Sequence, residues 1–176
     1  MVARHRYEMT VRWTGNAGSG TSDYRGYSRD HEVIADGKPA IPGSSEPPFR
    51  GDATRWSPEE LLVAALAQCH MLWYLHLCAA GGVVVTDYTD TPAGTMVMDA
   101  AGGGGQFTDV LLRPAVTVAD PSMADKARAL HDEIGALCFI ARSVSFPVRH
   151  EPTVRPARGT WSPATGTPSR PQQEQA

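Results

Sequence analysis

A long helix is predicted by residues 57–82, which read SPEELLVAALAQCHMLWYLHLCAAGG. Ser57 is a favoured N-cap residue, Pro58 suits the first helical position, and Glu60 stands where a capping box places its carboxylate. The pair Gly81-Gly82 gives a C-terminal stop. Because the residues between are apolar nearly all round, we expect this helix to be buried at the centre of the protein.

The same helix is long enough to cross a bilayer, which takes about 20 residues. Polar side chains nevertheless stand near its middle, namely Gln68, Cys69, His70 and His76. Such groups are costly in the hydrocarbon core of a membrane, and no charged residue flanks the C-terminal end. We therefore interpret the helix as the core of a protein that has no membrane partner.

Strand patterns lie on both sides of the helix along the chain. Tyr7, Met9, Val11 and Trp13 alternate with polar residues, which is the period of a half-buried strand. The dipeptide Asp36-Gly37 indicates a hairpin turn, because both positions tolerate positive φ. The predicted strands are Tyr7–Trp13, His31–Ala35, Lys38–Ile41, Val83–Asp90, Thr95–Ala100, Phe107–Val118 with a bend or edge at Pro114, and Ser145–His150. A second helix is predicted from the cap at Asp120-Pro121 to Leu137.

Length and charge limit the class of protein. A chain of 176 residues favours one domain. Sixteen Lys and Arg against nineteen Asp and Glu give a net charge of −3, which leaves no basic excess for phosphates and argues against a nucleic-acid partner. The first residues lack the apolar core of a signal peptide, so we expect a cytoplasmic protein. In that reducing compartment the three cysteines are not a disulfide scaffold.

The composition changes after Glu151. Prolines become frequent, and the apolar content is too low to form a packed core. We therefore expect a domain over residues 1–150 and a Pro-rich tail over residues 151–176. That tail is expected to be disordered or docked on the surface through Trp161.

Helix geometry limits what the cysteines can do. Cys69 and Cys78 are nine residues apart, which is about 13.5 Å along the helix axis, whereas a disulfide needs Cα atoms within about 7 Å. Within one chain, any disulfide made by Cys69 must therefore use Cys138. Cys78 points to the opposite face of the helix and is interpreted as a small core residue.

The reactivity of Cys69 depends on a cation from elsewhere in the chain. Its helix neighbours are mostly apolar, and a thiol in such surroundings is inert unless a positive charge stabilises the thiolate. The candidates for that charge lie upstream of the helix, at Arg25, Arg29, Arg50 and Arg55. Without such a partner, Cys69 is a packed core residue.

Two segments resemble motifs of the OsmC/Ohr family (osmotically inducible protein C and organic hydroperoxide resistance proteins). The matching residues are Ser57-Pro58-Glu59-Glu60-Leu61-Leu62, Ala64-Ala65, Gln68-Cys69-His70-Met71 and, 69 positions after Cys69, Cys138-Phe139-Ile140-Ala141. The resemblance covers residues 5–150. The segments 29–33 and 49–52 indicate a divergent OsmC-like branch.

The resemblance implies an α+β fold in which two long antiparallel helices pack against curved antiparallel β-sheets, intertwined as a homodimer. It also implies a thiol-dependent peroxidase that reduces organic hydroperoxides, needs no cofactor or metal, and is restored by a dithiol reductant. In that scheme Cys69 matches the peroxidatic cysteine and Cys138 the resolving cysteine, which together form a disulfide. Glu59 matches the glutamate that orients an activating arginine.

The arginine itself does not match by position. The family places it just after the first strand, where this chain has Gly15-Asn16-Ala17-Gly18. Arg29 is therefore the first candidate, with Arg50 and then Arg25 as the alternatives.

The spacing along the helix bears on the assembly. Glu59 and Cys69 are ten residues apart, which is about 15 Å along one straight helix and more than one arginine side chain can bridge. If both serve one site, a partner subunit that supplies the Glu59–Arg pair removes the difficulty, and two-fold symmetry then gives two equivalent sites. We expect the active site to lie at a dimer interface.

Two functions of other classes remain open. Cys69, His70, His76 and Cys138 are ligand types that Zn²⁺ takes, although the adjacent Cys69 and His70 face different ways on a helix. The other is a non-catalytic OsmC-like module that binds a small ligand in the same dimer cleft. Histidines without a motif partner are interpreted as hydrogen-bonded structural residues, namely His31, His70, His76 and His131.

Overall fold

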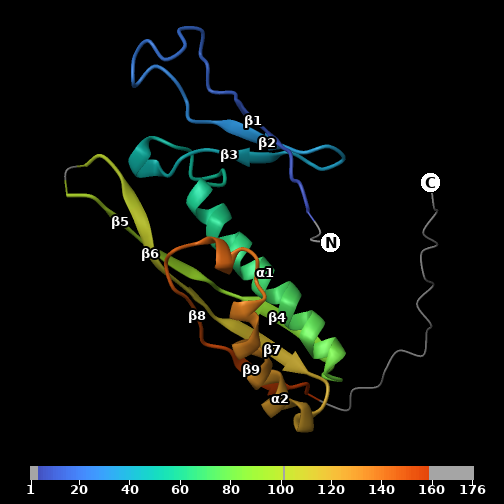
Figure 1. Cartoon of the computed structure of the whole chain (residues 1–176). Helices are drawn as coiled ribbons and strands as arrows, with labels where there is room; N and C mark the ends of the chain where they lie inside the picture. Colours follow the sequence, from blue (N-terminus) through green and yellow to red (C-terminus); the bar gives the residue numbers. More distant parts are fainter. Residues whose placement is uncertain (1–3, 101, 159–176) are drawn as a thin grey trace. The chain divides into compact units, whose positions relative to one another are not determined.

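The computed structural model describes residues 4–100 and 102–158. The chain divides into two compact units, Met1–Cys69 and His70–Ala176. The boundary between the units falls inside the longest helix, α1 (Pro58–Ala80), which runs without a break in Figure 1.

The first unit carries a three-stranded antiparallel sheet in the order β1-β2-β3. Its elements are β1 (Thr10–Trp13), β2 (His31–Ile34), β3 (Ile41–Gly43) and the short 3-10 helix η1 (Pro47–Phe49). Between β2 and β3, Gly37 has a φ of +68°, which residues with a side chain rarely adopt. The hairpin predicted around Asp36-Gly37 is confirmed.

The apolar face of the first strand is not half-buried as the alternation predicts. Tyr7, Met9 and Val11 are 81%, 61% and 66% exposed, and Trp13 is also exposed. The strand itself is shorter than predicted and begins at Thr10. In the part of the chain that the structure describes, all four side chains are exposed. The apolar face is therefore open in the single chain.

The start of α1 forms as the sequence predicts. The Ser57 backbone N–H donates to Oε2 of Glu60 at 2.8 Å, and the Glu60 N–H donates to Oγ of Ser57 at 3.1 Å. This reciprocal pair satisfies two backbone donors that a helix N-terminus otherwise leaves without partners. The capping box is therefore confirmed, and it fixes where α1 begins.

The rest of α1 corrects the expectation of a helix buried all round. Its buried residues are spaced four apart and lie on one face: Leu66, His70, Tyr74 and Cys78. The opposite face is exposed at Gln68, Leu72 and His76. By length and composition α1 could span a membrane, but the core helix of a soluble protein passes the same test. The described residues of this chain therefore bury one face of α1, although the helix is apolar nearly all round.

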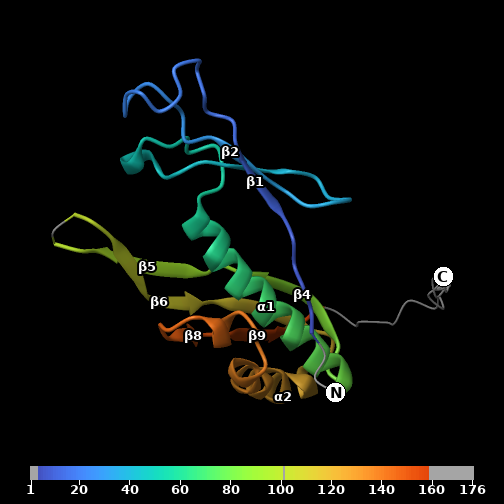
Figure 2. The ribbon, with the colours of Figure 1, turned by 45° about the horizontal axis from the view of Figure 1, so that its top comes forward.

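The second unit contains two three-stranded sheets, in the orders β4-β7-β9 and β5-β6-β8. The strands are β4 (Val85–Asp90), β5 (Ala93–Met98), β6 (Gly105–Leu112), β7 (Pro114–Val118), β8 (Val148–His150) and β9 (Thr153–Pro156). The hairpin of β5 and β6 projects from its unit (Figure 2). The bend predicted at Pro114 is confirmed, because the long strand divides there into β6 and β7, which enter different sheets.

Both sheets of the second unit are mixed rather than antiparallel. Strands β6 and β8 are parallel, as are β7 and β9. Parallel neighbours need a long crossover, and the helical residues between β7 and β8 provide it. The expectation of purely antiparallel sheets is therefore wrong for this unit.

The second predicted helix forms in three pieces. They are the 3-10 helix η2 (Pro121–Met123), the six-residue α2 (Ala124–Ala129) and the 3-10 helix η3 (Leu130–Ala136). Asp120 caps the start by accepting a hydrogen bond from the Ser122 N–H. Gly135 and Ile134 are weak helix formers, which is consistent with the tighter winding of the last piece. The second helix is therefore not one long α-helix.

Contacts within the second unit give the direction of these pieces. His70 of α1 bonds to His131, and Tyr74, one turn later, donates to the carbonyl of Ala127. The order of partners is reversed along the two segments. The antiparallel arrangement implied by the resemblance is therefore present between the C-terminal half of α1 and the α2–η3 segment.

Ordered structure continues past residue 150. Strand β9 lies inside the predicted tail and pairs with β7, and the Ala157 N–H donates to the carbonyl of Val118. Backbone pairing holds this segment despite its prolines, because Pro156 stands at the end of the strand. The start of the tail is therefore corrected, and the predicted docking of Trp161 lies outside the described residues.

Candidate active site

Cys69 lies in the middle of α1 and is partly exposed. Its thiol is free in the structure. Leu66 and His70 belong to the buried stripe of α1. Cys69 lies between them in the sequence but is only partly buried, so it lies at the edge of that stripe. A partly exposed thiol at this position is accessible to a small molecule, unlike Cys78, which is buried as predicted.

Cys138 is buried and directly follows the helical segment of the second unit. Its backbone N–H donates to the carbonyl of Ile134 at 2.8 Å. Its Sγ accepts a hydrogen bond from the Ala141 N–H at 3.3 Å. A backbone donor aimed at sulfur stabilises negative charge there. The turn that follows η3 therefore orients the sulfur.

Glu59 lies in the first turn of α1 and is partly exposed. Glu60, not Glu59, forms the capping box. Among the described residues of the first unit, no arginine forms an ion pair with Glu59. Its carboxylate therefore remains available to a cation.

Arg29 is held by two tyrosines of the loop before β2. Its guanidinium carbon lies 4.1 Å from the centroid of the Tyr27 ring and 4.5 Å from that of the Tyr24 ring. Its two Nη atoms donate to the carbonyls of Tyr27 and Tyr24 at 2.7 and 3.0 Å. These contacts fix the plane of the guanidinium and use two of its five N–H donors.

Of the other candidate arginines, Arg50 faces one of the same tyrosines, with its guanidinium carbon 6.0 Å from the centroid of the Tyr24 ring. Arg50 is exposed and has a φ of +66° at the end of η1. Arg55 lies closest to α1 in sequence, and its Nε lies 3.7 Å from Asp30 and 3.9 Å from Asp52. The sequence analysis included Arg55 among the four possible cations but did not rank it for the activating role, and its contacts with Asp30 and Asp52 hold it close to the start of α1.

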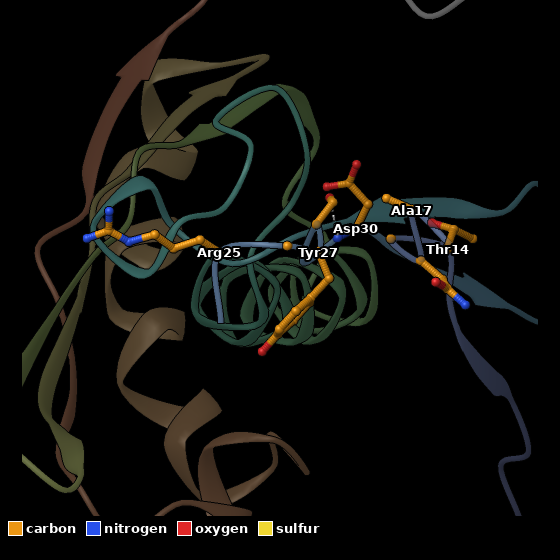
Figure 3. Close-up of a pocket in the computed structure, with 9 residues that line it drawn as sticks. Thr14, Ala17, Arg25, Tyr27 and Asp30 are labelled. Atoms are coloured by element: carbon orange, nitrogen blue, oxygen red, sulfur yellow. Dashed lines mark hydrogen bonds between the residues drawn. The ribbon is translucent and has the colours of Figure 1, made fainter. Parts of the chain in front are cut away.

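Arg25 lines an open pocket of the first unit with a volume of about 460 Å³. The side chains of Arg25, Tyr27 and Asp30 project in different directions (Figure 3). A ligand site needs polar groups that converge. The pocket contains no cysteine, so it does not form the predicted site.

The second unit contains a cluster of aromatic side chains, one of which follows Cys138 in the sequence. The rings of Trp73 and Phe139 meet edge to face with centroids 5.8 Å apart, and Trp73 meets His76 in the same way at 5.7 Å. Phe139 directly follows Cys138 and is 66% exposed. An exposed aromatic surface therefore adjoins the buried cysteine.

A cluster of three histidines was not anticipated as a group. Nε2 of His70 and Nδ1 of His131 are 2.9 Å apart, and the His150 ring lies 5.5 Å from that of His70. Burial lowers the pKa of His70 to about 4 and that of His131 to about 3, with neighbouring histidines adding to the effect. His150 is in turn bonded to Asp132 at 3.1 Å.

In the sequence, the signal for this histidine cluster is the four-residue spacing of Leu66, His70 and Tyr74, which places His70 on the buried face of α1. In residues 4–100 and 102–158, no group of three or more His, Cys, Asp or Glu is arranged to hold a metal ion. The zinc ligand set considered from the sequence is therefore not assembled in the described structure.

Comparison with known proteins gives the family. The sequence matches the family of OsmC-like proteins over residues 51–153, which is more than half of the chain. The chain belongs to this family and has its α+β fold. No functionally curated protein matches the sequence.

Solved structures agree with this assignment. An OsmC-like protein of unknown function from Vibrio cholerae is 30% identical with a TM-score of 0.75, and the match covers 85% of this chain and all of that one. An organic hydroperoxide resistance protein OsmC from Legionella pneumophila is 17% identical, with a TM-score of 0.60 over 86% of this chain and 98% of that one. A putative organic hydroperoxide resistance protein from Vibrio cholerae, with captopril in one active site, is 18% identical, with a TM-score of 0.56 over 86% and 93%.

Proposed function

We propose that this protein is a thiol-dependent peroxidase that reduces organic hydroperoxides with Cys69 and Cys138. The proposal is carried by the match to the OsmC-like family together with the resemblance of the segments around Cys69 and Cys138 to motifs of that family. The partial exposure of Cys69 and the N–H donor at Cys138 suit a substrate-reacting thiol and a second, sheltered thiol.

The proposed cycle begins with the Cys69 thiolate. It attacks the terminal oxygen of the hydroperoxide, the O–O bond breaks, and the alkoxide takes up a proton and leaves as an alcohol. Cys69 is then a sulfenic acid. The Cys138 thiolate attacks its sulfur, hydroxide leaves and becomes water, and the resulting disulfide is reduced by an external dithiol.

Arg29 is the proposed activating residue, with Glu59 as the carboxylate that orients it. The two tyrosine carbonyls occupy two of the five guanidinium N–H groups, so three remain for a thiolate and a carboxylate. A guanidinium whose plane is already fixed loses little entropy when it binds.

The chain is proposed to act as a homodimer, with Arg29 and Glu59 serving the partner's Cys69. The open face of β1 is an apolar surface of the kind that association buries, and Leu72 on the exposed side of α1 adds a further exposed apolar side chain. The distance between Glu59 and Cys69 along one helix gives a second reason for the partner's contribution.

The aromatic surface at Trp73 and Phe139 favours substrates with an apolar alkyl or aryl group. Such a group gains free energy when it leaves water for an aromatic surface, whereas hydrogen peroxide has no apolar part. We therefore expect faster reduction of cumene hydroperoxide than of hydrogen peroxide.

Steady-state assays of single variants test the proposal. Cys69→Ser removes turnover of cumene hydroperoxide with dithiothreitol as the reductant, whereas Cys78→Ala, the matched control in the core, keeps it. If Cys69→Ser turns over at the wild-type rate, the thiol mechanism is wrong. A wild-type protein without turnover that binds small apolar ligands would favour the non-catalytic module.

A further inference from the structure

The bond between His70 and His131 joins the two segments that carry the candidate redox cysteines. His70 directly follows Cys69 in α1. His131 lies in η3, which ends two residues before Cys138 and accepts the Cys138 N–H at the Ile134 carbonyl. The bond therefore connects α1, at the residue after Cys69, to the segment that leads to Cys138.

The pair is a costly way to fill a core. His131 has no exposed surface, and its Nε2 is a buried atom without a hydrogen-bond partner in the described part of the chain. Either tautomer leaves that nitrogen unsatisfied, which costs free energy that an apolar residue of similar size would not. Stability alone therefore does not explain why two histidines occupy this contact. Their cost favours a role in positioning the two segments that carry them.

The surroundings fix His131 in one orientation. Its ring stacks on that of Tyr74 at 3.9 Å, and the Tyr74 hydroxyl is itself bonded to the carbonyl of Ala127. The groups that face the pair are His150 from β8, which is paired with Asp132, and Tyr74 from α1. The position of the His131 ring in η3 is therefore coupled to α1 through its hydrogen bond with His70.

We propose that His131 is a positioning residue for the resolving step of the cycle. Through its bond to His70 it holds the Cys138 segment where the Cys138 thiolate attacks the sulfenic acid of Cys69. This inference rests on the proposed function. In that step an S–S bond forms, the S–O bond breaks, and the hydroxide that leaves takes up a proton to give water.

The test compares three variants of the full chain. His131→Leu removes the hydrogen bond, His131→Asn keeps a polar group near the position of Nδ1, and His5→Gln is a control at an exposed histidine of the first unit. Stopped-flow mixing with cumene hydroperoxide measures Cys69 oxidation, and acid quenching with mass spectrometry measures disulfide formation and sulfinic acid.

The expected result separates the two steps. His131→Leu leaves the rate of Cys69 oxidation within about threefold but slows disulfide formation roughly fivefold to tenfold, as the loss of one buried hydrogen bond predicts. Sulfinic acid then accumulates in excess peroxide. His131→Asn restores much of the disulfide rate, and His5→Gln matches the wild type.

Disulfide formation at the wild-type rate in His131→Leu would overturn the proposal. So would equal slowing of both steps, because that is the effect of a general loss of structure. If circular dichroism shows that His131→Leu does not fold, His70→Met and His70→Gln replace the Leu and Asn variants with the same expected contrast. A wild-type protein whose Cys69 does not react with peroxide would instead refute the peroxidase function, and the positioning role with it.

Discussion

Nε2 of His70 lies 2.9 Å from Nδ1 of His131, a residue 61 positions later in the chain, and both side chains are buried. The bond ties α1 to η3 through two neutral imidazoles. It also makes the fold sensitive to acid, because a buried pair of this kind resists protonation.

We predict that the free energy of unfolding falls as the pH drops below about 6.5. The unfolded chain takes up protons near the ordinary histidine pKa of 6.5, whereas burial lowers the folded pKa of His70 to about 4 and of His131 to about 3. The stabilisation is therefore present above pH 6.5 and is lost as the pH falls from that value to about 4 for His70 and about 3 for His131. The loss for His70 amounts to roughly 3 kcal/mol.

Urea unfolding at several pH values between 7.5 and 4 checks this prediction. The free energy of unfolding of the wild type should fall with acid relative to that of His131→Leu, because the leucine does not titrate. The control variant His5→Gln, at an exposed histidine of the first unit, should keep the wild-type slope. A difference that is the same at every pH would contradict the prediction.

The capping box should contribute to stability in a measurable way. Ser57→Ala removes the side-chain acceptor of the Glu60 N–H and is expected to lower the free energy of unfolding by about 1 kcal/mol. Ser57→Asp keeps an acceptor at the N-cap and should stay near the wild-type value. Chemical denaturation at pH 7 makes the comparison, and equal stability of the Ala and Asp variants would show that the bond contributes nothing.

We predict that the planar guanidinium of Arg29, and not only its positive charge, contributes to the rate of peroxide reduction. Arg29→Lys keeps the charge but loses the planar contact with Tyr24 and Tyr27, so we expect the rate constant for Cys69 oxidation to fall about tenfold or more. Arg25→Lys, in the same loop, is the control and should retain the rate. Unchanged kinetics in Arg29→Lys would move the activating role to another arginine, with Arg55 as the next to test.

A charge on the open face of β1 should weaken the proposed dimer. Val11→Glu places a carboxylate among apolar side chains that association would bury, at a cost of several kcal/mol if it stays unpaired. Thr10→Glu, next to it on the other face of the strand, is the control. Sedimentation velocity should show a shift to the monomer for Val11→Glu only, and a wild-type protein that is a monomer with full activity would contradict the dimeric site.

Local features of the fold could be predicted from the sequence. The capping box at Ser57 and the glycine turn at Gly37 depend on residues within four positions, so their patterns suffice. Strand β9 was missed because its pairing with β7 depends on residues about 40 positions away, while its prolines suggested a tail. The uncovered side of α1 has a similar cause, since apolar periodicity does not say whether the cover comes from the same chain.

The site was predictable where chemistry follows a motif and not where it depends on tertiary contacts. Cys69, Cys138 and Glu59 could be proposed by resemblance alone. The cation contacts of Arg29 with Tyr24 and Tyr27 had no such motif. The stacking of His131 on Tyr74 likewise required the packed structure, because the two residues are far apart in the sequence.

The most direct test of the central claim is peptide mapping of the protein after one equivalent of cumene hydroperoxide. The reduced protein is oxidised, alkylated without a reducing agent and digested, and the linked peptides are identified by mass spectrometry. Our account predicts one major product, in which the peptide containing Cys69 is joined to the peptide containing Cys138, while Cys78 remains alkylated. A Cys69 that stays alkylated after complete peroxide treatment would contradict the account.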